Sequence, residues 1–138
     1  MAYYAVIDTN VLVSALLSGH DDAATVQVIH RLYDGDFIPL FSEDILREYN
    51  QVLRRKKFRF SEETVCTLVE TITECGEYIV PTPTGEYFFD RTDLPFYEVA
   101  MERQNDNAHL VTGNLKHFPD KTFIVTPREF LDILSYKK

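Results

Sequence analysis

Four oxygen-bearing side chains share one feature: each lies at, or overhangs, the carboxyl edge that we predict for a parallel sheet. They are Asp8, Glu48, Asp93 and Asn114. Converging carboxylate and amide oxygens are the donors that Mg²⁺ or Mn²⁺ takes in proteins. A cation held there can lower the pKa of a bound water and clamp a phosphodiester for in-line attack. The four residues are therefore candidate catalytic residues, provided that the fold brings them together.

Asp8 is the residue around which the chain is organised. It follows an apolar run, residues 3–7, which no polar position interrupts, so the run reads as a strand buried on both faces. Helical spacing resumes at Val11. Ligands in open α/β sheets gather at such a junction, beyond the carboxyl end of a strand. The simpler interpretation is that Asp8 only caps the helix, and for an isolated junction it is the better one.

Strands and helices alternate along the whole chain, which predicts an α/β fold: a three-layer sandwich with a mostly parallel five-stranded sheet between helices. Pro39 weakens the second strand, so we expect a bulge or a poorly paired end there. A complete capping box at residues 126–129 predicts the start of the last helix. The predicted strands are residues 3–7, 37–41, 77–80, 108–111 and 123–125.

Two helices carry the remaining acids. Ser42 is the predicted N-cap of the helix that holds Glu48, and Glu48 falls just outside the apolar stripe of that helix, beside Val52. Taken alone, a boundary glutamate that reaches water by its flexible stem is the better explanation. Asp93 is predicted at the cap of the fifth helix, with Pro95 in the first turn, where the missing N–H costs little.

Composition limits the function classes. The chain has 138 residues, a net charge of −8 and a pI near 4.9, which argues against a protein that grips nucleic acid through its overall charge. That objection weakens if some acids hold a metal ion, because the cation offsets their charge. A local basic run, Arg54-Arg55-Lys56-Lys57 with Arg59, is as consistent with a solvated helix end as with phosphate contacts.

The same numbers predict one domain, residues 1–138. No apolar run approaches the roughly 20 residues of a membrane span, and the N-terminal residues lack a basic targeting region, so we expect a cytoplasmic protein without a membrane partner. Cys66 and Cys75 have neither CxxC spacing nor a histidine at metal-ligand distance. We expect them to be reduced thiols without a chemical role.

The sequence resembles the PIN-domain nucleases, and especially the VapC-like toxin components of bacterial toxin–antitoxin pairs. Any one of the matching motifs is weak, but five occur in the right order. They are residues 6–15 (VIDTNVLVSA); Ser42 with Glu48-Tyr49-x-x-Val52-Leu53; Asp90-x-x-Asp93-x-x-Phe96-x-x-x-Ala100; residues 110–114 (LVTGN); and residues 126–131 (TPREFL).

The resemblance implies a strand order of 3-2-1-4-5, with the acids meeting where strands 1 and 4 adjoin, and RNA cleavage that depends on Mg²⁺ or Mn²⁺. It also implies a protein antitoxin and a homodimer as partners. On the matching positions the implied metal ligands are Asp8, Glu48 and Asp93; the residues implied to orient them or a bound water are Asn10, Ser42 and Thr112.

One position departs from the family. The family usually has an acid where this chain has Asn114, and an amide brings no charge, so a second metal should bind more weakly. Asp90 and Asp106 are nearby in sequence but outside the matching position. Lys116 and His117 follow in the same loop, where a phosphate contact and an ordinary surface role are about equally expected.

Two other functions are consistent with parts of the sequence. A binding module that keeps the fold without catalysis is favoured by Asn114 and by the acidic pI. An aspartyl-phosphate phosphatase also has an Asp after the first strand, but that chemistry needs a second acid two residues later. This chain has Asn10 there. Metal-dependent RNA cleavage is the discriminating activity.

Overall fold

The sheet has five parallel strands in the order β3-β2-β1-β4-β5, which confirms the predicted fold class and strand order. The structure is a computed structural model, and it describes residues 2–136. The strands are β1 (Tyr4–Ile7), β2 (Ile38–Phe41), β3 (Glu77–Tyr78), β4 (Ala108–Val111) and β5 (Ile124–Val125).

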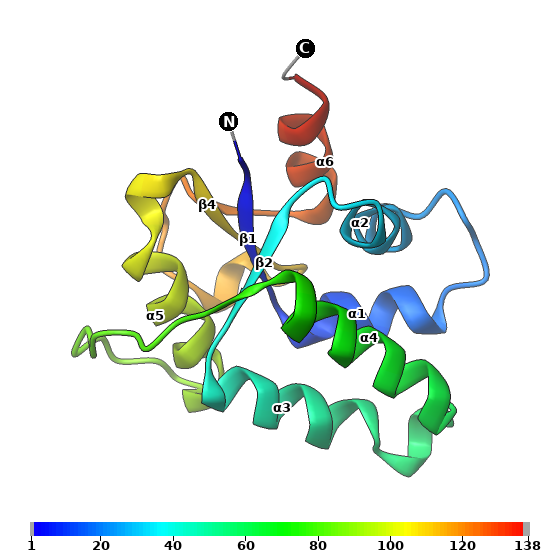
Figure 1. The fold of residues 1–138 in the computed structure, drawn as a ribbon. Helices are drawn as coiled ribbons and strands as arrows, with labels where there is room; N and C mark the ends of the chain where they lie inside the picture. Colours follow the sequence, from blue (N-terminus) through cyan, green and yellow to red (C-terminus); the bar gives the residue numbers. More distant parts are fainter. Residues whose placement is uncertain (1, 137–138) are drawn as a thin grey trace.

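Helices lie on both sides of this sheet (Figure 1). Helix α5 packs against β1, β2 and β4, whereas α4 packs against β2, and α2 packs against α6. The helices of residues 2–136 are α1 (Thr9–Leu17), α2 (Ala24–Tyr33), α3 (Glu43–Leu53), α4 (Glu62–Cys75), α5 (Leu94–Glu102) and α6 (Pro127–Tyr136), with short 3₁₀ turns η1 (Lys56–Phe58), η2 (Arg91–Asp93), η3 (Gln104–Asp106) and η4 (Leu115–His117).

Strand β1 is the centre of the sheet and fixes the position of Asp8. All four residues of β1 pair with β4, from Tyr4 beside Ala108 to Ile7 beside Val111. The backbone N–H of Asp8 continues the ladder and donates to the carbonyl of Val111 at 2.9 Å. Because parallel strands end at the same edge, Asp8 and the residues after Val111 lie side by side.

Pro39 lies in the interior strand β2, whose pairing is divided between its two neighbouring strands. Ile38 and Pro39 pair with β1, whereas Leu40 and Phe41 pair with β3. Strand β3 is shorter than predicted, although the N–H of Ile79 still donates to Phe41 at 2.8 Å. Gly76 ends α4 close to the backbone of β2. A Cβ at Gly76 would lie 2.3 Å from the carbonyl oxygen of Pro39, so only glycine fits there.

The caps of the helices match the sequence patterns. The Ser42 hydroxyl accepts from the N–H of Ile45 at 3.3 Å, and Asp93 stands at the N-cap of α5. Thr126 and Glu129 form the reciprocal capping box of α6, with bonds of 3.1 and 2.8 Å. Of the helices within residues 2–136, none combines the length and the apolar character needed to cross a membrane.

Candidate active site: an acidic pocket at the carboxyl edge of the sheet

The carboxyl edge of β1 and β4 opens into a pocket of about 430 Å³. Asp8, Glu48, Asp93 and Asn114 all line it, together with Asn10. The fold therefore brings the four candidate catalytic residues to one cavity, although they come from the junction after β1, from α3, from the start of α5 and from the loop after β4.

The main hydrogen bond to the Asp8 carboxylate comes from Thr112, directly after the neighbouring strand, and not from the helix that Asp8 precedes. Asp8 occupies the N-cap position of α1, but its side chain makes no capping bond. Instead, the hydroxyl of Thr112 donates to its Oδ2 at 2.8 Å, and the N–H of Asn114 donates to the same hydroxyl at 3.0 Å. Thr112 is fully buried and its hydroxyl has one proton to donate, so these two bonds fix the orientation of the carboxylate of Asp8, a residue that is only 5% exposed.

Glu48 reaches the pocket because its neighbour anchors α3 in the core. The hydroxyl of Tyr49, which is buried, donates to the carbonyl of Ile7 at 2.5 Å. Consecutive residues of a helix point about 100° apart, so Glu48 is directed away from the core and toward the cavity. The predicted boundary position of Glu48 thus becomes a position on the pocket wall.

Asp93 faces a histidine across the pocket. Its Oδ2 lies 3.4 Å from Nδ1 of His117, which pairs with it when the imidazole is protonated. Asp90, three residues earlier, also lines the pocket, where its carboxylate accepts from the N–H and the hydroxyl of Thr92 at 3.0 and 2.7 Å. These contacts hold the turn that leads into α5.

Burial and mutual repulsion change the protonation of these acids. Burial, then the charges of Asp8 and Asp90, raise the pKa of Asp93 to about 6. Burial, then the charge of Asp8, also raises the pKa of Glu48. Burial raises the pKa of Asp8 against the opposing effects of the Thr112 hydroxyl and nearby backbone N–H groups. The pocket therefore holds more negative charge than its surroundings neutralise.

The predicted supporting residues separate into two groups. Asn10 lines the pocket, and its buried Oδ1 has no hydrogen-bond partner within residues 2–136, whereas Thr112 is fully buried behind the pocket and holds Asp8. Ser42 caps α3 and lines a different cavity. Its effect on the pocket is therefore indirect, through the helix that carries Glu48 and Tyr49.

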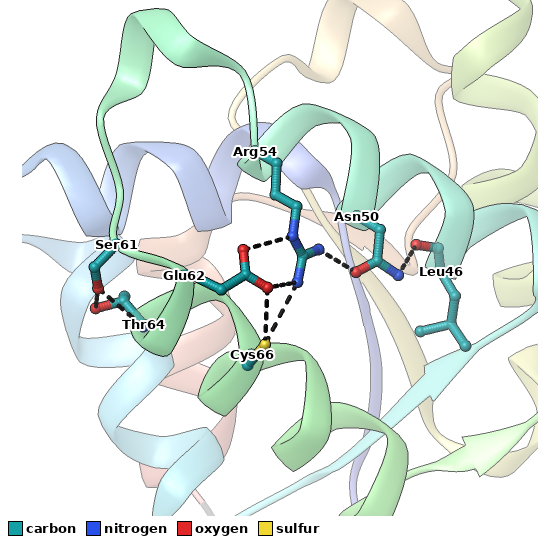
Figure 2. Close-up of polar contacts among 7 residues, drawn as sticks. All are labelled: Leu46, Asn50, Arg54, Ser61, Glu62, Thr64 and Cys66. Carbon is teal, nitrogen blue, oxygen red and sulfur yellow. Dashed lines mark hydrogen bonds and ion pairs between the residues drawn. The ribbon is translucent and has the colours of Figure 1, made fainter.

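The turn between α3 and α4 brings two further residues, Arg55 and Phe58, to the pocket wall. Figure 2 shows what holds the two helices together: Arg54 donates to Glu62 at 3.0 and 2.7 Å and to Asn50 at 2.5 Å. The Cys66 thiol joins the same network through Glu62, at 3.2 Å. Arg54 thus joins α3 to α4, whereas the other residues of the basic run lie in the turn between these helices.

Sequence reasoning missed several pocket residues. Asp90, Thr92, Arg55 and Phe58 reach the cavity from turns, and no strand or helix pattern identifies residues of this kind. His117 also lines the pocket, which distinguishes it from an ordinary surface residue. Asp106 does not: its carboxylate pairs with Arg103 at 2.7 Å, in the turn that precedes β4 at the opposite edge of the sheet.

The chemistry of the donor set fits a hard divalent cation. Within residues 2–136, no three Asp, Glu, His or Cys side chains form a ready-made metal site. Mg²⁺, however, is commonly held by only one or two carboxylates and retains several waters. Asp8 and Asp93 are such carboxylates, Glu48 is a third on the same wall, and the unpartnered Oδ1 of Asn10 is available to a ligand or its water.

A family model for the PIN domain matches residues 4–116. The chain belongs to the PIN-domain family. PIN domains are generally nucleases, so the fold described above is a nuclease fold. Neither a curated protein nor a solved structure matches the chain. The PIN match runs from β1 to η4 and contains all four candidate catalytic residues, while β5 and α6 follow it.

Proposed function

We propose that this PIN-domain protein is an endoribonuclease that uses Mg²⁺ or Mn²⁺. The observation that carries the proposal is the pocket itself: the carboxylates of Asp8, Glu48 and Asp93, with that of Asp90 beside them, share one cavity at the carboxyl edge of a nuclease fold. Burial, and after it the charge of neighbouring acids, raises the pKa of Glu48 and of Asp93. Such a site favours a cation and repels a bare phosphodiester.

The side chains of this pocket have distinct tasks in the proposed reaction. Asp8, fixed by Thr112, and Asp93 would hold the cation, and Glu48 would add a third carboxylate or orient a water. When bound, the cation would supply charge neutralisation and a water of lowered pKa. His117, at 3.4 Å from Asp93, is placed to donate to a phosphate oxygen when it is protonated. The amide of Asn114 leaves the site with one acid fewer than the family usually has.

The choice of RNA and the role as a toxin rest on the resemblance of the sequence to VapC-like proteins. A protein antitoxin would cover the acidic pocket, and a basic side chain fits that task best, because an arginine fork matches a carboxylate cluster. A homodimer belongs to the same proposal. Sedimentation of the chain alone would test the dimer, and a strict monomer at high concentration would contradict it.

The deciding experiment is cleavage of mixed RNA substrates by the purified chain. Activity should appear with Mn²⁺, vanish with a chelator, and be lost in Asp8→Asn and in Asp93→Asn. Asp106→Asn is the matched control, because Asp106 lies outside the pocket and should keep full activity. RNA binding without cleavage at any metal level would instead identify an inactive PIN-fold binding module.

A further inference from the structure

A second cavity, of about 490 Å³, adjoins the acidic pocket and shares Asp90, Asp93 and His117 with it. The remaining residues that line it are Phe89, Arg91 and Lys116. One wall of this cavity therefore belongs to the candidate active site, and the other is aromatic and basic. We propose that this second cavity is a nucleotide subsite, which binds one unpaired base and the adjoining phosphate of a single-stranded RNA.

Phe89 is the residue that would stack on the base. Its side chain is 97% exposed, whereas the preceding Phe88 is 6% exposed. An exposed phenyl ring offers a face on which any base can stack, and base stacking on aromatic side chains is the main contact of proteins that bind single strands. A base within a duplex is already stacked and paired, so only an unpaired base can use this ring.

The position of Phe89 is fixed by the packing of the residue before it, Phe88. The ring of Phe88 packs against Tyr97 and Phe118, with centroids 5.3 and 5.8 Å apart. Phe118 directly follows η4, which carries Lys116 and His117. The contact between Phe88 and Phe118 thus joins the two segments that supply the cavity. This contact thus holds together the segment that carries Phe89 and Arg91 and the segment that carries Lys116.

Arg91 and Lys116 would bind the phosphate. Both side chains are exposed, and neither takes part in an ion pair anywhere in residues 2–136. Asp90 and Asp93 line the wall of this cavity that it shares with the acidic pocket, so the anion site is formed at the other wall, by Arg91 and Lys116 with Phe89. A nucleotide supplies the matching pair of groups, a flat base and a phosphate.

The subsite extends the proposed function. That its ligand is RNA rests on the proposed function. The shared residues place it directly beside the acids, so a strand bound there would pass from the second cavity into the acidic pocket. Phe89 would then help to select single strands.

Binding of a fluorescent single-stranded RNA tests the subsite, with Asp8→Asn as the common background so that cleavage does not interfere. Adding Phe89→Ala should weaken binding about tenfold, in line with the removal of one stacked base. Phe89→Trp should retain the affinity. Tyr87→Ala is the matched control: Tyr87 is 85% exposed in the same loop but does not line the cavity, and its removal should leave the affinity unchanged.

A set of RNAs in which one base at a time is removed gives the sharper test. At one position of the RNA, removal of the base should weaken binding to the protein that retains Phe89. The same removal should not change the affinity of the Phe89→Ala variant. Four results would overturn the subsite: equal affinity with and without Phe89, duplex RNA binding as tightly as the single strand, no position showing this coupling, or no RNA binding at all. The first is also the result expected if this loop contacted a protein partner instead.

Cleavage in the unmutated background separates the subsite from the proposed function. Coupled binding at Phe89 without any cleavage would support the subsite and contradict the nuclease. Normal cleavage in Phe89→Ala, with unchanged affinity, would support the nuclease and contradict the subsite.

Discussion

The hydroxyl of Tyr49 donates a 2.5 Å hydrogen bond to the carbonyl of Ile7, the last residue of β1. Each partner directly adjoins an acid of the pocket: Glu48 precedes Tyr49 on α3, and Asp8 follows Ile7. This bond therefore ties the helix that carries Glu48 to the strand that ends next to Asp8.

Tyr49→Phe should lower both stability and activity. The substitution leaves a buried carbonyl without this partner, which costs about 1–2 kcal/mol of unfolding free energy. Cleavage should lose kcat more than KM, because the two acids are displaced while the binding surface remains. Tyr97→Phe is the control: the Tyr97 hydroxyl is also buried but has no hydrogen-bond partner within residues 2–136, so its removal should cost little. Equal effects of the two substitutions would exclude a positioning role for Tyr49.

Asp8→Asn should change the response to metal rather than the fold. Without metal the variant should melt no lower than the wild type, because relief of repulsion offsets a weaker bond to Thr112. With millimolar Mn²⁺ the wild type should gain stability by mass action, and the variant much less. Thermal melts of both proteins with and without Mn²⁺ measure this. An identical metal-induced shift would remove Asp8 from the metal site.

Asp93 should make the protein less stable as the pH rises. Its pKa is about 6 in the folded protein, against about 3.9 in an unfolded chain, so between these values the folded state binds the proton more tightly. Raising the pH through this interval removes that proton and destabilises the fold. Asp93→Asn lacks this penalty and should be more stable than wild type at pH 7 by about 1 kcal/mol, since water in the open pocket screens the repulsion.

Denaturant unfolding from about pH 4 to about pH 7 measures that difference, which should vanish at the acid end of the range. Asp106→Asn controls for the removal of one negative charge outside the pocket. A stability difference that stays constant with pH would show that Asp93 does not titrate in this interval.

Within the basic run, we expect Arg54 to support the fold and Arg55, Lys56 and Lys57 to contact phosphates. Arg54 is occupied by Glu62 and Asn50, whereas Arg55 lines the pocket and Lys56 and Lys57 are exposed. Replacing Arg55, Lys56 and Lys57 with glutamine should weaken RNA binding for all sequences. It should also flatten the log–log salt dependence, by about 0.7 in slope for each phosphate that the variant no longer neutralises. Arg54→Gln should lower the melting temperature and leave the slope nearly unchanged. Equal slopes for wild type and the triple variant would mean that the run does not touch the phosphates.

The fold was largely predictable because its signals are local. Uninterrupted apolar runs identify buried parallel strands, and the polar residues after β1 and β4 identify the edge where Asp8 and Thr112 meet. Ser42 shows the limit of this reasoning. A serine before a helix predicts a cap, and the structure shows that cap, whereas its place relative to the pocket depends on packing that no local pattern encodes.

The rest of the site depends on contacts between distant turns. Phe58 and Asp90 line one cavity because the turn after α3 and the turn before α5 meet there. Phe89 lies in a stretch whose alternating exposure (Tyr87 out, Phe88 in, Phe89 out) is set by the rings of Tyr97 and Phe118. A sequence without these partners gives no reason to place one phenylalanine inside and the next outside.

The hydrogen bond between Thr112 and Asp8 spans 104 residues of sequence and joins two adjacent strands of the sheet. At a translation rate of roughly 10 residues per second, about ten seconds pass on the ribosome between the synthesis of Asp8 and that of Thr112. A nascent chain that stalls before β4 has the first acid but neither the strand that pairs with β1 nor the hydroxyl that orients it. Because the pocket forms only when nearly the whole chain has been made, incomplete translation products of this protein should lack the assembled acidic pocket.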